Sequence, residues 1–233
     1  MDERFIQLKT ILTVYLQEAF DNVKALELCK QNVVSSHAEF GPSSKMASQG
    51  LGMFYFMIGQ NRITIDRLDS GFKAYIGYLE SVLAQKKIPL DKEEKRLKSN
   101  WEAHIADIAK AKKSLEDREA AIARVHGKEE REVLGAIAIK FTDETNYILK
   151  LNNVLALYAD YIGTLEDKLK IEGGFLTEDM TANMLKDIYL GLEKQFEFEI
   201  ERVCPNPKCA QTIMVSPQSP KLICPFCGGN VGI

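Results

Sequence analysis

The sequence predicts an all-α fold, an elongated and coiled-coil-like bundle of about five helices followed by a small cysteine-based C-terminal module. Apolar residues recur at steps of three and four over long stretches, which is typical of amphipathic helices. Proline, which breaks helix interiors, occurs only at Pro42 and Pro89 in the first 204 residues. Four cysteines fall within the last thirty residues and mark a different kind of structure there.

The first two helices are predicted from their apolar stripes. One stripe runs from Phe5 to Val33, and the first helix is expected to end in a loop from Ser35 to Ser44. The second helix is expected over about residues 44–87, where the stripe includes Phe54, Ile58, Ile65, Leu68, Phe72, Tyr75, Leu79 and Val82. Gly50 and Gly52 weaken its beginning, each by roughly 1 kcal/mol relative to alanine.

The third and fourth helices differ in the width of their apolar faces. The third is predicted over about 91–125, beginning after Pro89 with acids in its first turn. Its heptad seam from Leu97 to Ile122 is narrow, so the helix packs against one or two neighbours and is otherwise solvated. The fourth is predicted over 128–171, with a wide stripe between Leu134 and Leu169. The pair Gly173-Gly174 suits its C-terminal end.

The fifth helix is predicted to begin at the cap Thr177-Glu178-Asp179. Its expected apolar face consists of Leu185, Ile188, Leu192, Phe196, Ile200 and Val203, so the helix would run directly into Cys204 without a flexible linker. The predicted domains are therefore residues 1–201, with long antiparallel helices, and the cysteine module at residues 202–233.

The net charge limits the class of partner that we expect, and the hydropathy pattern indicates the cellular compartment. Thirty basic and thirty-three acidic side chains give a net charge of −3, which argues against general affinity for a polyanion. The start of the sequence has no basic segment followed by a long apolar core, and no apolar run is long enough to span a bilayer. We therefore expect a cytoplasmic protein in a reducing setting.

The cysteines Cys204, Cys209, Cys224 and Cys227 form two short-spaced pairs, C-x4-C and C-x2-C, separated by fourteen residues. Four thiolates complete the tetrahedral shell of a structural zinc ion, and the short spacings bring the ligands together at little entropic cost. The sequence thus predicts one structural Zn²⁺ with no open coordination site. Two disulfides in an oxidising compartment are the alternative.

The same segment resembles the zinc ribbons, a family of small four-cysteine β-hairpin modules. The matching residues are Cys204-Pro205-Asn206-Pro207-Lys208-Cys209 and Cys224-Pro225-Phe226-Cys227-Gly228-Gly229. The resemblance implies hairpin strands at 211–215 and 221–223 around the loop 216–220. The family's first knuckle is usually C-x2-C, so this chain has two extra residues in that loop.

Several single residues are candidates for further sites. Polar Asn61, His104, Arg118 and Glu144 interrupt apolar seams, where they either form a buried polar cluster or, as we favour, fix helix register or lie at the bundle edge. Arg118 and Glu144 are a possible ion pair. The histidines His37, His104 and His126 lack the Glu-x-x-His spacing of a di-metal bundle, and His126 with Glu129 and Glu130 is interpreted as a solvated hinge. Lone Cys29 is interpreted as a small apolar packing group.

The segment from Met46 to Met57 combines methionine with aromatic residues around more than half of a helix. We favour a core position for it over an adaptable surface for a partner or second subunit. The chain has no phosphate loop, dinucleotide fingerprint or G-x-S-x-G motif, so we expect no enzyme activity.

Three functions are consistent with these features. We favour a non-catalytic scaffold or adaptor in which a helical bundle presents a zinc ribbon for protein–protein interaction, with possible homo-oligomerisation. A nucleic-acid or ribonucleoprotein binding factor is the alternative, weakened by a module with only Arg202, Lys208 and Lys221 as cations. The third is a membrane-surface protein, since the three long helices are similar in length to those of BAR-like dimers. There Lys110, Lys112, Lys113 and Arg124 would contact anionic lipid.

Overall fold

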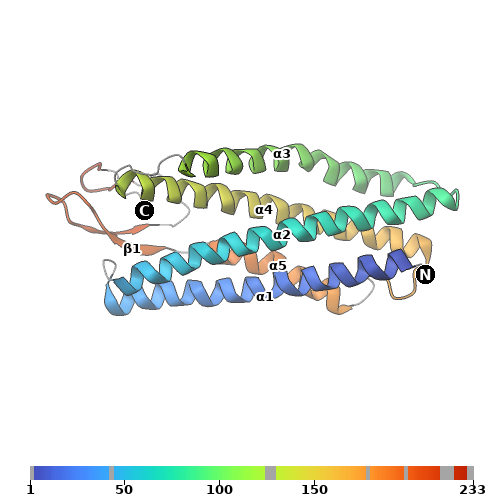
Figure 1. The fold of residues 1–233 in the computed structure, drawn as a ribbon, viewed down its shortest axis with the longest axis horizontal. Helices are drawn as coiled ribbons and strands as arrows, with labels where there is room; N and C mark the ends of the chain where they lie inside the picture. Colours follow the sequence, from blue (N-terminus) through green and yellow to red (C-terminus); the bar gives the residue numbers. More distant parts are fainter. Residues whose placement is uncertain are drawn as a thin grey trace. The chain divides into compact units, whose positions relative to one another are not determined.

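The computed structural model describes residues 3–41, 45–123, 130–176, 179–196, 199–215 and 223–229. Within these ranges the chain is predominantly helical, and the predicted all-α class with five helices is confirmed (Figure 1). The elements are the helices α1 (Glu3–Phe40), α2 (Lys45–Gln85), α3 (Lys92–Ala123), α4 (Glu130–Leu169) and α5 (Asp179–Phe196) and the strands β1 (Ile200–Val203) and β2 (Thr212–Val215). None of the helices, over the residues described, has a stretch both long and apolar enough to cross a membrane.

The chain divides into two compact units that each take parts of several helices. The first unit comprises Met1–Val23, Asn61–Lys110 and Ile148–Leu192, and the second comprises Lys24–Gln60, Ala111–Tyr147 and Glu193–Ile233. The cysteine module lies in the second unit. The predicted division of the chain at residues 201 and 202 stays a prediction.

Helix α1 is longer than its apolar stripe predicts. Residues 35–40 continue the helix, so the prediction of a loop beginning at Ser35 is wrong. The helix ends where Gly41 takes a φ of +80° and its N–H donates to the His37 carbonyl. His37 itself is buried, with its Nδ1 2.8 Å from the Val33 carbonyl oxygen. A glycine in the left-handed region is a usual helix C-terminus, and this signal decides the end of α1.

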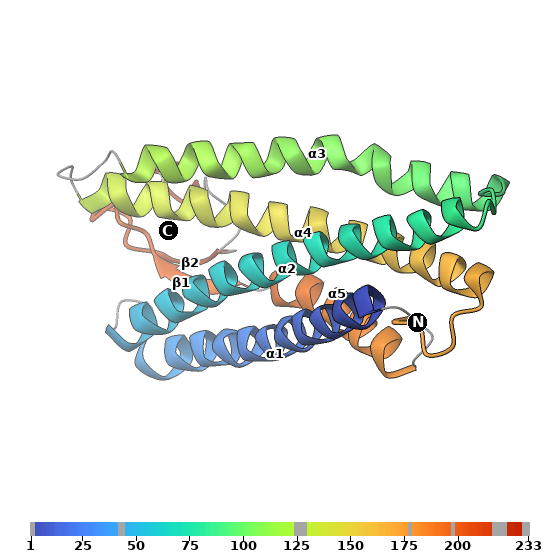
Figure 2. The same cartoon turned by 45° about the vertical axis from the view of Figure 1, so that its right-hand side comes forward.

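The core of the first unit combines apolar packing with hydrogen bonds from tyrosine to carboxylate. Tyr158 donates to Asp69, Tyr75 to Glu166 and Tyr161 to Glu80, over 3.0, 2.6 and 2.6 Å. Each bond joins α2 to α4. The sequence separation between the partners stays between 81 and 91 residues in all three bonds. A nearly constant separation means that the two segments run in the same direction (Figure 2).

Helix α3 packs with one narrow face, as predicted. Trp101, Ile108 and Leu115 are buried at seven-residue spacing, whereas most of the positions between them are exposed. In the first unit α3 is joined to α4 by Lys168, which contacts buried Glu94 at 2.6 Å. In the second unit Arg118 and Glu119 of α3 pair with Asp143 and Lys140 of α4. These pairings make α3 and α4 antiparallel.

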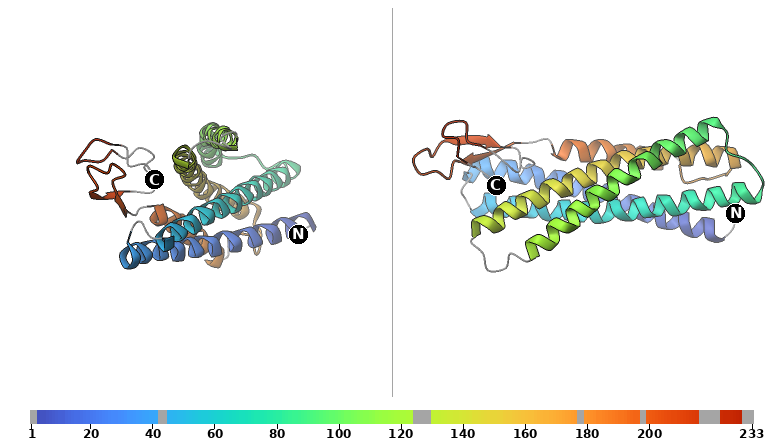
Figure 3. Two further views of the ribbon diagram at one scale, coloured as in Figure 1. Left: turned by 60° about the vertical axis from the view of Figure 1, so that its left-hand side comes forward. Right: turned by 90° about the horizontal axis from the view of Figure 1, so that it is seen from above.

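The C-terminal residues form a two-stranded antiparallel sheet (Figure 3). In its register Ile200 faces Val215 and Val203 faces Thr212. The prediction that Ile200 and Val203 belong to the fifth helix is therefore wrong, because α5 ends at Phe196 and both residues lie in β1. Strand β2 confirms most of the predicted strand 211–215. The rest of the predicted hairpin, at 216–222, lies outside the described residues.

The methionine and aromatic segment of α2 is divided between core and surface. Phe54 and Ile58 are fully buried, as predicted for core residues. Met46, Met53 and Phe56 are 51%, 56% and 59% exposed, so the prediction that the whole segment is core is wrong for these three. An apolar segment that covers more than half of a helix exceeds what neighbours on one side can bury.

Candidate metal centre

Two short loops, or knuckles, each present two cysteines. The first knuckle is 204–211 and the second is 224–229. In both knuckles the N–H of the first cysteine donates to the carbonyl of the residue two positions after the second cysteine. These bonds are Cys204 N–H to Gln211 O, at 2.9 Å, and Cys224 N–H to Gly229 O, at 2.8 Å. The two loops therefore close in the same way although one is two residues longer.

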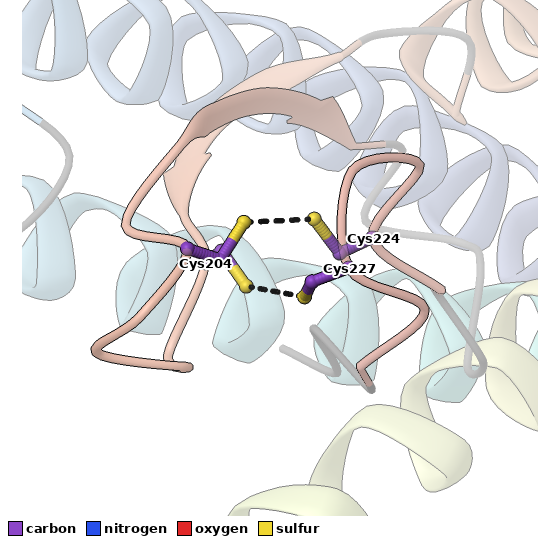
Figure 4. Close-up of side chains that lie close together, drawn as sticks. Cys204, Cys224 and Cys227 are labelled. Atoms are coloured by element: carbon purple, nitrogen blue, oxygen red, sulfur yellow. Dashed lines mark hydrogen bonds between the residues drawn. The ribbon is translucent and has the colours of Figure 1, made fainter.

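The sulfur atoms of the two knuckles converge (Figure 4). Cys204 Sγ lies 3.6 Å from Cys227 Sγ, and Cys209 Sγ lies 3.7 Å from Cys224 Sγ. All four Sγ atoms lie within 4.8 Å of one another. With Zn–S bonds of about 2.3 Å, two sulfurs of a tetrahedral ZnS₄ site are separated by roughly 3.8 Å. The arrangement thus fits a tetrahedral metal ion with four thiolate ligands.

The distances between the sulfur atoms also distinguish this cluster from a pair of disulfides. A disulfide requires sulfur atoms about 2.05 Å apart, whereas the cysteines here are all free. Two of them, Cys204 and Cys224, are buried, and Cys227 is exposed. Four sulfur donors favour zinc over hard cations such as magnesium and calcium, which prefer oxygen.

Backbone geometry in the second knuckle supports a thiolate. The Gly229 N–H donates to Cys227 Sγ at 3.4 Å. This hydrogen bond is the largest of several that together lower the pKa of the Cys227 thiol to about 7. Gly228 has a φ of +68°, and its N–H donates to the Cys224 carbonyl. The glycines after Cys227 therefore allow the turn that points an amide at sulfur.

Asn206 organises the longer first knuckle. Its carbonyl oxygen accepts hydrogen bonds from the N–H groups of Cys209 and Ala210, at 2.9 and 3.0 Å. Its side-chain oxygen accepts from the Lys208 N–H at 3.1 Å, which forms an Asx turn. The two extra residues are therefore absorbed in a hydrogen-bonded turn. This role for Asn206 was not predicted, although an asparagine between two prolines is a turn signal.

The four polar candidates differ in burial. Asn61 and Glu144 are buried, at 0% and 4% exposure. His104 is exposed and Arg118 is partly exposed. The suggested pairing of Arg118 with Glu144 is corrected by one residue, since Arg118 Nε contacts Asp143 at 3.3 Å. A one-residue shift on a helix turns the side chain by about 100°, which periodicity alone does not resolve.

The remaining candidates have structural roles or lie outside the described residues. Cys29 is partly buried in α1, and burial raises the pKa of its thiol, which disfavours the reactive thiolate. It belongs to neither knuckle. His126 and Glu129 lie outside the described residues. Glu130 begins α4, and its side chain is not described.

Sequence reasoning missed the buried carboxylates of the first unit. Glu166 is fully buried and accepts hydrogen bonds from Tyr75 and from the N–H groups of Phe175 and Leu176. Burial raises the pKa of Glu166 in spite of these bonds. The available signal was a glutamate within the apolar stripe of α4. This carboxylate holds the loop after α4 in place, which is a structural role.

Comparison of the chain with protein-family models, with curated proteins and with solved structures finds no match.

Proposed function

We propose that Cys204, Cys209, Cys224 and Cys227 hold one structural zinc ion in a zinc-ribbon module, and that the chain is a non-catalytic scaffold presenting this module to a protein partner. The convergence of four sulfur atoms from two similarly closed knuckles supports the metal site. When bound, zinc supplies four bonds that link the knuckles. The chain's own contribution is to aim the sulfurs and to donate the Gly229 N–H to one of them.

The surface of the module supports a protein partner. Its exposed large apolar side chains are Val203, Met214, Ile223 and Phe226, of which Ile223 and Phe226 are 68% and 65% exposed. Large apolar side chains exposed on a small module are typical of protein contact surfaces. The cysteine module at residues 202–233 has only three cations, Arg202, Lys208 and Lys221. Three cations are few for neutralising the phosphates of a nucleic acid.

Metal analysis of protein purified under reducing conditions tests the zinc site. We expect one zinc per chain in the wild type and in Cys29→Ser, because Cys29 is not part of the four-cysteine cluster. Cys224→Ser removes one thiolate and should lose the ion, with zinc content falling below about a tenth of the wild-type value. Circular dichroism should keep its helical signal in all three proteins. Absence of zinc from the wild type, or its loss in Cys29→Ser, would refute the assignment.

Affinity purification from the source cells tests the scaffold role. A protein partner should be recovered with the wild type but not with Phe226→Ser, which removes an exposed ring and leaves all four ligands intact. Lys208→Ser is the matched control for a nucleic-acid partner. Recovery of RNA or DNA that depends on Lys208 and disappears at high salt would favour the nucleic-acid function instead.

A further inference from the structure

A cavity of about 560 Å³ lies between α4 and α5 in the first unit. Its apolar wall includes Leu155 of α4 and Ile188 and Tyr189 of α5. The volume falls within the range of about 300–1,000 Å³ that small-molecule sites occupy in proteins. None of the described residues that line this cavity belongs to the cysteine module.

Small residues of α4 form one side of the cavity. Ala156, Ala159 and Gly163 all line it, and they lie on successive turns of the helix. A Cβ atom added to Gly163 would meet no heavy atom within 4 Å. The chain's own packing therefore does not require glycine there, although glycine weakens a helix relative to alanine. The absent side chain leaves volume for something other than this chain.

A buried polar group with unused hydrogen-bonding capacity also lines the cavity. Asn152 is 2% exposed, and its Nδ2 donates to the Tyr189 carbonyl at 3.2 Å, which links α4 to α5. Its Oδ1 has no hydrogen-bond partner among the described residues and is not fully enclosed by them. An acceptor that stays accessible on an otherwise buried side chain can accept a hydrogen bond from a donor that enters the cavity. The cavity therefore offers one fixed acceptor.

Two opposite charges line the same cavity. Asp160 of α4 and Lys186 of α5 are both exposed and line it, and neither forms an ion pair within the described ranges. Their charges balance. A ligand with a net charge would be attracted to one and repelled by the other, so the cavity favours a molecule without net charge.

We propose that this cavity binds an uncharged, mainly apolar small molecule that carries one hydrogen-bond donor, such as an aromatic or aliphatic alcohol. The apolar body packs against Leu155, Ile188 and the open space at Gly163. The ligand's O–H or N–H donates to Asn152 Oδ1. This inference does not depend on zinc binding or on the scaffold function.

Calorimetric titration with two matched probes tests the proposal on the full-length protein. The first probe, 2-naphthol, has a hydroxyl donor, and the second, 2-methoxynaphthalene, has a similar apolar body without the donor. We expect 2-naphthol to bind about tenfold more tightly, since one hydrogen bond to a buried acceptor contributes on the order of that factor. Equal affinity for the two probes, or no binding of 2-naphthol, would overturn the proposal.

Variants of the protein test whether 2-naphthol binds in this cavity. Gly163→Leu fills the cavity and should weaken 2-naphthol binding at least tenfold. Gly77→Leu is the matched control, because Gly77 is also a helical glycine of the first unit whose added Cβ meets nothing within 4 Å, and it lies outside the cavity. Asn152→Ser should reduce the preference for 2-naphthol to about twofold.

Circular dichroism checks that each variant folds. If Asn152→Ser unfolds, Gly163→Leu and the two probes still decide the question. Unchanged binding in Gly163→Leu would contradict the proposal. One further outcome would contradict it. If the wild type bound neither probe but self-associated, and if Gly163→Leu abolished that self-association, a second copy of the chain would be the occupant of the cavity.

Discussion

Ala210 takes the same place in the first knuckle that Gly228 takes in the second, with a φ of +45° where Gly228 has +68°. Each residue directly follows the second cysteine of its knuckle. The left-handed region is unstrained for glycine, but it costs an alanine about 1 kcal/mol. The two knuckles thus share a backbone turn, and only the second has the residue that suits it.

Ala210→Gly should therefore stabilise the folded cysteine module, and Gly228→Ala should destabilise it. We expect a change of about 1 kcal/mol in each direction, or roughly fivefold in apparent zinc affinity. Competition with a chromogenic chelator measures this. Ala103→Gly, at an exposed position of α3, is the control, because the same substitution there should weaken the helix and leave zinc affinity unchanged. A lower zinc affinity in Ala210→Gly would contradict the shared turn.

Glu166 should make the stability of the protein depend on pH. Its folded pKa is raised above 4.5, mainly by burial, so between the unfolded and folded pKa values the folded state holds the proton more tightly. The stabilisation is complete below the unfolded pKa and is lost as pH rises through the folded pKa. The free energy of unfolding of the wild type minus that of Glu166→Gln should fall with rising pH, by up to about 1.4 kcal/mol per pH unit.

Chemical denaturation of both proteins between pH 4 and pH 8 measures this difference, in which the contributions of other titrating groups cancel. Glu172→Gln is the control, since Glu172 is an exposed carboxylate of the same loop. A difference that rises with pH would mean that the hydrogen bonds from Tyr75, Phe175 and Leu176 outweigh the burial of the charge.

Tyr158→Phe should destabilise the first unit through a lost hydrogen bond. The Tyr158 hydroxyl donates to Asp69 Oδ1 at 3.0 Å, and both residues are buried. Removing a donor from a buried carboxylate costs about 1.5–3 kcal/mol. Tyr15→Phe is the matched control, because Tyr15 is partly exposed and its hydroxyl has no hydrogen bond to any residue in the described ranges. Equal free energies of unfolding in the two variants would show that the bond contributes nothing.

Gly191→Ala should be destabilising although alanine is the better helix former. An added Cβ would lie 2.5 Å from Val23 Cγ1, and a β-branched side chain cannot rotate away easily. We expect a loss of about 1–3 kcal/mol from overpacking. Gly77→Ala has open space around the new methyl group and should gain about 0.5–1 kcal/mol. Thermal unfolding of both variants gives the comparison, and stabilisation by Gly191→Ala would show that α1 and α5 are not this close.

By itself, the sequence determined the all-α class, the five helices to within a few residues at most ends and the set of four cysteines. These features are local: a helix shows its period within a few turns, and two knuckles show their spacing within six residues. The two wrong predictions of secondary structure, the end of α1 and the strand β1, also arose from local patterns. The end of α1 depended on Gly41, and β1 was taken for helix because Ile200 and Val203 continue the three- and four-residue steps of α5.

Only the tertiary structure decided which residues meet across the helices and strands. The partner of β2, the tyrosine–carboxylate bonds of α2 with α4 and the cavity beside Gly163 all depend on residues far apart in the chain. A stripe identifies the buried face of a helix, but neither its rotation nor its register against a neighbour. Arg118 pairs with Asp143 and not with Glu144 for this reason, since a single residue step changes which side chain faces the partner.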